Sequence, residues 1–558
     1  MINIFVFTLQ TLITYLIGRS VYLMTVRIFK QKLSDLKILR IEPNNFYLLF
    51  GLFAIGNISF IFNFFGGINQ IAFYIILIFI IIYNFKQLNF PSFNFQNMFV
   101  KLSIFGVFII STYNAGLSKD SDTYHLNNQL FIRDESIIFG LSNLHHRYGF
   151  SSLWEYIGAN YWIHDNFVFL QTPSILIFVS FYIFLYSFLI SKDMKYKKIS
   201  LIILFFGLID NFGFQGGRNG FVGIDEIGAF DNTFGLLFII SLIFCINLLI
   251  DDSPSNLDIF VVGLLILFSG QVRYLGFILT IPYLLLIFKN KLNSSDFRKI
   301  FSIGFLLSAL WFLKNLIISS CLIYPINITC LSSLKWYQES QAIVVNKSIR
   351  GHPRHPNDIF SSLNDFKWVS DPWLPNNSDY LLNFIFSLLV VKLIFFVKPT
   401  IKSIKYYIFS ITFFVSWFVL TPAYRYATPI FLSILILINL DYVKSDKRPL
   451  ILFNSKFLVF SLFVICLILT VRVDSYKTFV SNPFNSINIA PNTIEYVSRN
   501  NFYGLKPKDG KVCFLKKDCF PDEYEVTVDR FLNYKIIIPE NPNYWNEFLL
   551  NIENKKSI

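Results

Sequence analysis

Two aspartates and a histidine follow directly on a long apolar run, and their types and spacing suit acid–base or metal chemistry. Asp120, Asp122 and His125 come just after the run Phe99 to Leu117. A carboxylate close to hydrocarbon loses hydration, which makes it a better proton acceptor. Two carboxylates spaced D-x-D can also share a divalent cation such as Mg²⁺ or Mn²⁺. Asp120 and Asp122 are therefore candidate catalytic residues and metal ligands; the alternative is that they only cap and solvate a helix end.

More aromatic and basic side chains follow in the same polar segment. Tyr124 precedes His125, and His145 and Arg147 belong to an Asn-Leu-His-His-Arg run. Phenol, imidazole and guanidinium groups can orient a hydroxyl or hold a phosphate. Their presence favours a substrate-binding role for this segment over capping alone.

Charged residues also stand at the ends of other apolar runs. Arg273 separates two such runs, and Arg425 lies between two tyrosines. Either arginine can hold a phosphate at the lipid–water interface, and snorkelling to lipid headgroups is the alternative for both. Asp225 and Glu226 are further candidate acids. Asp231 is expected only to cap a helix.

The long polar segment 321–377 carries alternating arginine and histidine. His352, Arg354 and His355 are interleaved with prolines and precede two tryptophans. Such groups can bind a phosphate or pyrophosphate, and tryptophan presents an apolar face on which a sugar ring can stack. Two histidines without a third fixed ligand make a weak case for zinc. An ordinary solvated loop is the alternative.

The six cysteines divide between apolar and polar segments. Two lie in apolar runs and are expected to be packing residues. Cys513 and Cys519 lie close together in the polar tail and can form a small-loop disulfide on an oxidising face. Cys321 and Cys330 are a second candidate pair.

The elements that position these residues are membrane helices. Of 558 residues, 54% are hydrophobic and 15% are charged, and the apolar residues form long runs such as 46–65 and 167–190. A bilayer core about 30 Å thick needs roughly 20 apolar residues per crossing. We therefore predict an all-α polytopic membrane protein with about 14 transmembrane helices. The net charge of +13 sits mostly in short loops, which indicates a membrane surface and no nucleic acid.

The strongly basic loops and the loops that carry candidate site residues fall on opposite faces of the predicted bilayer. Lysine and arginine gather in alternate loops, which the positive-inside rule assigns to the cytoplasm. The extracytoplasmic face then receives loops 118–166 and 321–377, and we expect juxtamembrane helices in these outer loops, on the membrane within 118–166. The predicted division is a membrane domain, 1–473, and a small polar C-terminal region, 474–558, in which residues 534–538 are strand-like.

The first outer loop resembles known membrane enzymes. Asp120-Ser121-Asp122-Thr123-Tyr124 is similar to the D-E-x-x-Y signature of the GT-C superfamily of glycosyltransferases, with the second acid displaced by one position. The runs 120–126 and 140–150 resemble more closely a group of bacterial multi-pass proteins with D-x-x-x-Y-H-L and G-L-x-N-L-H-x-R segments. Lys314-Asn315 is similar to the R-N pair of a later segment in that group, with lysine replacing arginine.

The resemblance implies a GT-C-like helical bundle in a bacterial inner membrane with an extracytoplasmic active face. Such an enzyme would move a sugar, with inversion, from a polyprenyl-phosphate donor to a cell-surface glycan or lipid acceptor. Asp120 would be the general base, and Arg273, Arg354 or Arg425 would stabilise the departing phosphate. Asp122 and His125 would orient the acceptor or hold a metal.

Two alternatives stay open. A transporter or flippase for lipid-linked glycans would carry ionisable residues near the bilayer midplane and paired halves, and the sequence shows few of the former and no repeat. A glycan polymerase or ligase of unrelated fold would depend on an essential histidine or arginine instead of Asp120.

Overall fold

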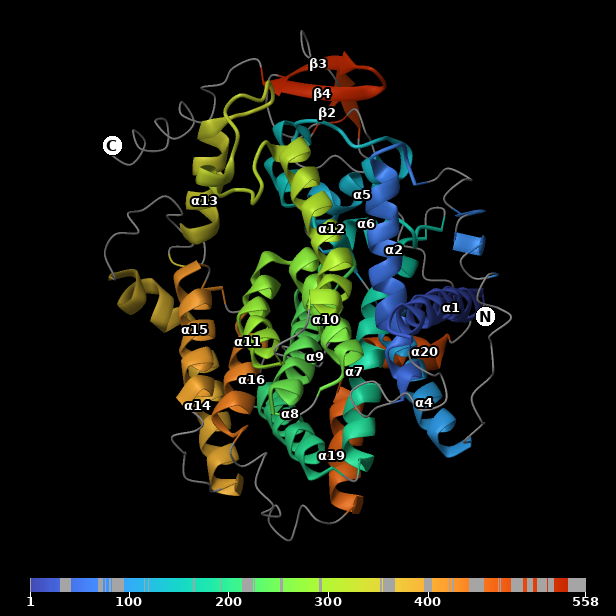
Figure 1. Ribbon diagram of the computed structural model, residues 1–558, viewed down its shortest axis with the longest axis vertical. Helices are drawn as coiled ribbons and strands as arrows, with labels where there is room; N and C mark the ends of the chain where they lie inside the picture. Colours follow the sequence, from blue (N-terminus) through green and yellow to red (C-terminus); the bar gives the residue numbers. More distant parts are fainter. Residues whose placement is uncertain are drawn as a thin grey trace.

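The computed structural model of the chain is mostly helical (Figure 1). It describes the following residues: 2–30, 42–68, 74–75, 77–79, 82, 95–114, 116–118, 120–163, 166–191, 193–212, 224, 226–250, 254–290, 294–351, 354, 367–395, 404–420, 422–423, 426–440, 456–469, 471, 473–482, 495–498, 505–508, 519 and 526–539.

Most of the long helices run along one direction of the molecule, and α1 lies across that direction (Figure 1). In chain order the α-helices are α1 (Ile2–Ile28), α2 (Tyr47–Asn63), α4 (Phe95–Ser111), α5 (Leu126–Asp134), α6 (Leu153–Gly158), α7 (Thr172–Ile190), α8 (Met194–Phe212), α9 (Asp231–Ile250), α10 (Asn256–Val272), α11 (Thr280–Asn290), α12 (Ser294–Ser319), α13 (Glu339–Gly351), α14 (Leu374–Phe395), α15 (Ile404–Leu420), α16 (Ala427–Ile438), α19 (Lys456–Leu469) and α20 (Val473–Ser481).

Several helices are long and apolar enough to cross a membrane. Among the described residues these are Asn3–Ile28, Phe167–Ile190, Asp231–Ile250 and Ser294–Ser319. A fifth span is added if α19 and α20, which are bent by 80°, form one broken span. Shorter apolar helices of 10–17 residues accompany them. The chain is therefore a helical membrane protein, while the count of about 14 spans and the orientation stay predictions.

The helix bundle buries its most apolar members. α7 and α9 carry buried side chains on all sides, as expected for helices that are hydrophobic all round. α1 and α2 cross closely at two glycines, because a β-carbon at Gly18 would lie 1.7 Å from the carbonyl oxygen of Tyr47 and one at Gly51 would lie 2.0 Å from that of Thr14. Outer helices expose large apolar side chains, such as Phe305 on α12, which a bilayer would cover.

The first outer loop folds into short helices as predicted, but protein covers them. A single π-helical turn, η4 (Ser121–His125), leads into α5, and a 3₁₀ turn, η6 (His146–Phe150), precedes α6. α5 and α6 bury polar and apolar side chains alike, among them Asn128 and Glu155. Neither helix therefore lies open on a membrane surface in the way the amphipathic pattern suggested.

Two antiparallel hairpins form the described part of the C-terminal region. β1 (Tyr496–Ser498) pairs with β2 (Leu505–Pro507), and β3 (Val526–Phe531) pairs with β4 (Tyr534–Pro539). β4 confirms the strand-like run in the sequence. The β3–β4 hairpin sits at the same end of the molecule as α5, α6 and α13 (Figure 1).

Residues of the G-L-x-N motif join this hairpin to both outer loops. Gly140 has a left-handed backbone (φ +68°), and a β-carbon there would lie 2.5 Å from the carbonyl oxygen of Ile537 and from Cβ of Trp336. The amide of Asn143 donates to the carbonyl oxygens of Trp336 and Ile537 at 3.0 and 3.1 Å. Lys535 also pairs with Glu135 at 2.8 Å. The hairpin is thus an integral part of the outer layer.

Candidate functional site

Asp120 stands at the start of the π-helical turn η4. Its backbone is helical (φ −77°, ψ −23°), but its half-buried carboxylate makes no capping hydrogen bond. The turn is fixed by Ser118 and Ser121, whose hydroxyl oxygens lie 2.8 Å apart, and the Ser121 hydroxyl donates to the carbonyl of Ile227. The backbone of the turn is therefore fixed next to Asp120, and the Asp120 carboxylate does not cap the turn.

Tyr124 lies at the centre of a stack of rings from the first outer loop. Its ring centroid is 4.1 Å from that of His125 and 6.0 Å from that of His145, to which it is nearly parallel at 15°. The guanidinium carbon of Arg147 lies 5.8 Å from the Tyr124 centroid. His146 extends the stack, 4.8 Å from His145. The loop thus returns on itself and brings the two motifs of the sequence together.

Charged groups from separate segments converge on the Tyr124 phenol. Burial raises its pKa far above the ordinary value, and the charges of Asp120 and Glu155 act in the same direction. The charges of Arg147 and Arg273 oppose them. The phenol is therefore neutral and able to donate a hydrogen bond at physiological pH.

The two neighbouring histidines are neutral. Burial, with the charges of His146 and Arg147, lowers the pKa of His145 well below its ordinary value, and burial and Arg147 lower the pKa of His146 to about 3. The backbone N–H of Arg147 donates to Nδ1 of His145 at 3.3 Å, so the proton of that imidazole sits on Nε2. A negatively charged substrate group would therefore be held by the arginines, with His145 as a neutral donor.

His125 is oriented by a buried carboxylate. Its Nδ1 is hydrogen-bonded to Glu155 of α6, whose other oxygen accepts from the amide of Gln129 at 3.0 Å. The indole N–H of Trp162 donates to Gln129 at 2.7 Å. His125 and Glu155 are both buried, at 6% and 3% exposure. This chain of hydrogen bonds fixes the imidazole so that Nδ1 faces Glu155.

Arg273, which follows α10, adjoins this group of side chains, here called the Tyr124 cluster: Tyr124, His125, His145, Arg147 and Arg273. It pairs with Asp231, the first residue of α9, and its guanidinium carbon lies 4.7 Å from the ring of Phe230 and 4.6 Å from that of Tyr426. Phe230 packs edge-on against His125 at 5.6 Å. Asp231 therefore does more than begin a helix, because its carboxylate links α9 to Arg273; the expectation that it caps the helix stays a prediction.

Comparison with known proteins identifies one family. Residues 1–432 match the model of a family described as a domain of unknown function (DUF8201). The chain belongs to this family. No curated protein and no solved structure matches it. The match contains every residue of the Tyr124 cluster and ends before the β-hairpins, and it identifies no glycosyltransferase family.

Arg354 belongs to a different neighbourhood from the Tyr124 cluster. Its guanidinium donates to the carbonyl oxygen of Val419 at 2.6 Å and lies 4.6 Å from the ring of Trp368. Burial, with a smaller effect of Arg350, lowers its pKa to about 10. Trp368 packs in turn against Trp373 and Phe418. The contacts of Arg354 are those of a cation packed into an aromatic cluster that joins the second outer loop to α15.

Several predicted site residues cannot be placed in the cluster. His352, His355, Arg425, Asp225 and Cys513 lie outside the described residues, as does the side chain of Asp122. Cys519 is disulfide-bonded, and Cys321 and Cys330 form a disulfide as predicted. Among the described residues, no group of three or more His, Cys, Asp or Glu side chains is placed to hold a metal ion.

Sequence reasoning missed Glu155 and its hydrogen-bond partners. The signal was present, because Glu155 interrupts the apolar stretch Leu153–Gly158, and a carboxylate that is buried there needs a partner. Spacing along the chain does not reveal that the partner is His125, on the other side of the loop. Glu226, a predicted secondary acid, is exposed.

Proposed function

We propose that the chain is a membrane glycosyltransferase with its active face outside the cytoplasm of a bacterial cell. It takes a sugar from a polyprenyl-phosphate donor and delivers it to a cell-surface glycan or lipid acceptor. The observation that carries the proposal is that Arg147 lies 5.8 Å from the Tyr124 ring, while the charges of Asp120, which caps no helix, and of Arg273 also act on the Tyr124 phenol. A proton acceptor and cations that can hold a phosphate are what such a transfer requires. A GT-C-like bundle of about 14 spans is part of the same proposal.

The residues divide the work of one inverting displacement. Asp120 accepts the proton of the acceptor hydroxyl as its oxygen forms a bond to the anomeric carbon. The bond from that carbon to the phosphate oxygen breaks, and its electron pair leaves with the polyprenyl phosphate. Arg147 and Arg273 balance the developing negative charge, while Tyr124 and His125 orient the acceptor.

The function is tested with the purified chain in proteoliposomes. Radiolabelled polyprenyl-phosphate mannose and polyprenyl-phosphate glucose serve as donors, with total membrane lipid as the acceptor. We expect transfer of label together with release of polyprenyl phosphate, and a higher donor KM for Arg147→Gln. Arg530→Gln, on the exposed face of β3, is the matched control and should leave the donor KM unchanged. Absence of both transfer and donor cleavage would count against the proposal.

A flippase for lipid-linked glycans is the second candidate, because α12 buries an amine. Lys314 is fully buried, donates to the carbonyl oxygen of Ser151 at 2.5 Å and lies 3.0 Å from the ring centroid of Trp311. An ionisable residue buried in a membrane helix often marks a substrate pathway. A flippase would move a fluorescent polyprenyl-linked sugar across the bilayer with the sugar–phosphate bond intact, whereas the proposed enzyme breaks that bond.

A further inference from the structure

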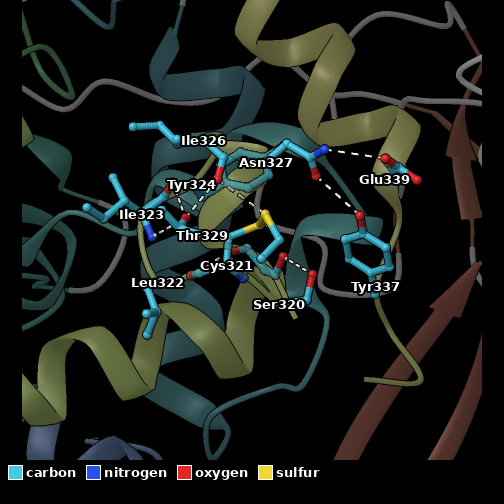
Figure 2. The surroundings of a disulfide bond; sticks show 12 residues. Ser320, Cys321, Leu322, Ile323, Tyr324, Ile326, Asn327, Thr329, Tyr337 and Glu339 are labelled. Atoms are coloured by element: carbon cyan, nitrogen blue, oxygen red, sulfur yellow. Dashed lines mark hydrogen bonds between the residues drawn. A yellow bond between two sulfur atoms is a disulfide. The ribbon is translucent and has the colours of Figure 1, made fainter. Parts of the chain in front are cut away.

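A disulfide closes the loop that follows α12. Cys321 and Cys330 are bonded just after Ser319, the last residue of that helix (Figure 2). Within the loop, the backbone N–H of Leu322 donates to the carbonyl of Thr329 at 3.0 Å, and that of Thr329 donates to Ile326 at 2.9 Å. The loop thus satisfies several of its own polar backbone groups. Such pairing is required in a low-dielectric environment, because unpaired backbone groups are costly there.

Four aliphatic side chains in and next to this loop are exposed. Its exposed aliphatic side chains are Leu322 (41%), Ile326 (41%), Ile328 (92%) and Leu331 (46%). Leu322 and Ile326 lie on one side of the disulfide, and Asn327, with its partners Tyr337 and Glu339, lies on the other (Figure 2). A group of large aliphatic side chains exposed on one short loop is costly in water and marks a contact surface.

The inner side of the loop is anchored in the protein. Tyr324 is buried at 1% exposure, and its ring packs edge-on against Phe150 at 5.4 Å. A β-carbon at Gly149 would lie 2.6 Å from the Tyr324 ring, so the contact is close. The orientation of the loop is therefore set by packing on the first outer loop.

The loop also folds back towards the membrane helix that it follows. The amide of Asn315, within α12, donates to the carbonyl oxygen of Leu322 at 3.1 Å. α12 itself exposes large apolar side chains, including Phe305, Leu306 and Leu313. The candidate membrane span Ser294–Ser319 thus ends directly before the loop, which places the loop at the edge of the bilayer.

We propose that the exposed aliphatic side chains of the disulfide loop, Leu322, Ile326, Ile328 and Leu331, insert among phospholipid acyl chains at the edge of the bilayer. The loop is closed by the disulfide and bonds several of its backbone amides internally, which lowers the cost of entering the lipid. Tyr324 transmits that anchoring to the first outer loop, which carries the Tyr124 cluster. The proposal concerns lipid contact and does not depend on the reaction that the cluster performs.

Photo-crosslinking in nanodiscs of phosphatidylethanolamine and phosphatidylglycerol tests the proposal. A benzophenone amino acid replaces Ile328, and in a matched control it replaces Phe531, which is 62% exposed on the β3–β4 hairpin. We expect a protein–lipid adduct by mass spectrometry from position 328 and none from position 531. A crosslinked protein dimer from position 328 in place of lipid, or equal lipid adducts from both positions, would overturn it.

A second pair of variants separates lipid contact from folding. With the benzophenone at Ile326, Ile328→Asp should lower the yield of lipid adduct, because a charge there resists insertion. Ile328→Leu should keep the yield. Since Ile328 is 92% exposed, neither change disturbs packing within the protein. An unchanged yield for Ile328→Asp contradicts the proposal.

Discussion

The most specific structural prediction concerns Gly140, where the first outer loop meets the second outer loop and the C-terminal hairpin. Gly140→Ala places a β-carbon on a left-handed backbone (φ +68°), which costs about 1–2 kcal/mol. The same β-carbon would lie 2.5 Å from both the Ile537 carbonyl oxygen and Trp336 Cβ, and overpacking of this kind costs about 1–3 kcal/mol. We expect Gly140→Ala to lower the free energy of unfolding by about 2–5 kcal/mol in total.

The assay is thermal unfolding of detergent-purified protein, followed by the fraction that stays monodisperse, with limited proteolysis to detect release of the hairpin. Gly304→Ala is the matched control, because a β-carbon there has no neighbour within 4 Å and a helical alanine is favoured over glycine. Gly140→Ala should lower the unfolding midpoint and expose the C-terminal region to protease, and Gly304→Ala should do neither. Equal unfolding midpoints and equal protease sensitivity of the two variants would refute the close contact of Gly140 with Trp336 and Ile537.

Three further outcomes follow from the outer layer. The pKa of His146 is about 3 in the folded protein and 6.5 ordinarily, so as pH falls the unfolded chain takes up this proton before the folded chain does. Stability should therefore fall as pH drops from about 6.5 towards 3. His146→Gln should reduce this pH dependence of the unfolding midpoint. Asp231→Asn and Arg273→Gln should each destabilise the fold by about 1–3 kcal/mol, and the double variant should lose less than their sum, as measured by a double-mutant cycle. Replacing Cys321 and Cys330 together by alanine should lower the free energy of unfolding by about 2–3 kcal/mol relative to the disulfide-bonded wild type, because the bond closes a short loop.

Much of the architecture follows from the sequence because its physical cause is local. Continuous apolar runs predict α7 and α9, since a helix that is hydrophobic all round must be buried or cross a membrane. A run of β-branched isoleucines predicts the strand Tyr534–Pro539. The Cys321–Cys330 disulfide was one of two candidate pairs among the cysteines of the polar segments.

The site was predictable only in part, because its contacts cross the fold. The motif residues Tyr124, His125, His145 and Arg147 do meet, as their clustering along the chain suggested. Glu155 did not stand out, since its partner lies on another turn of the loop. Arg354 packs in an aromatic cluster, whereas the charge of Arg273 acts on Tyr124. This difference depends on which helices are neighbours, and a single sequence does not carry that information.

The central claim is that the Asp120 carboxylate accepts a proton during transfer from a lipid phosphate. The direct measurement is the rate of sugar transfer in proteoliposomes by Asp120→Asn, beside Asp122→Asn and the exposed control Asp529→Asn on β3, at equal levels of membrane-inserted protein. We predict a loss of about 10²–10⁴-fold for Asp120→Asn and no loss for Asp529→Asn. Full activity of Asp120→Asn would contradict the claim and transfer the role of base to Asp122.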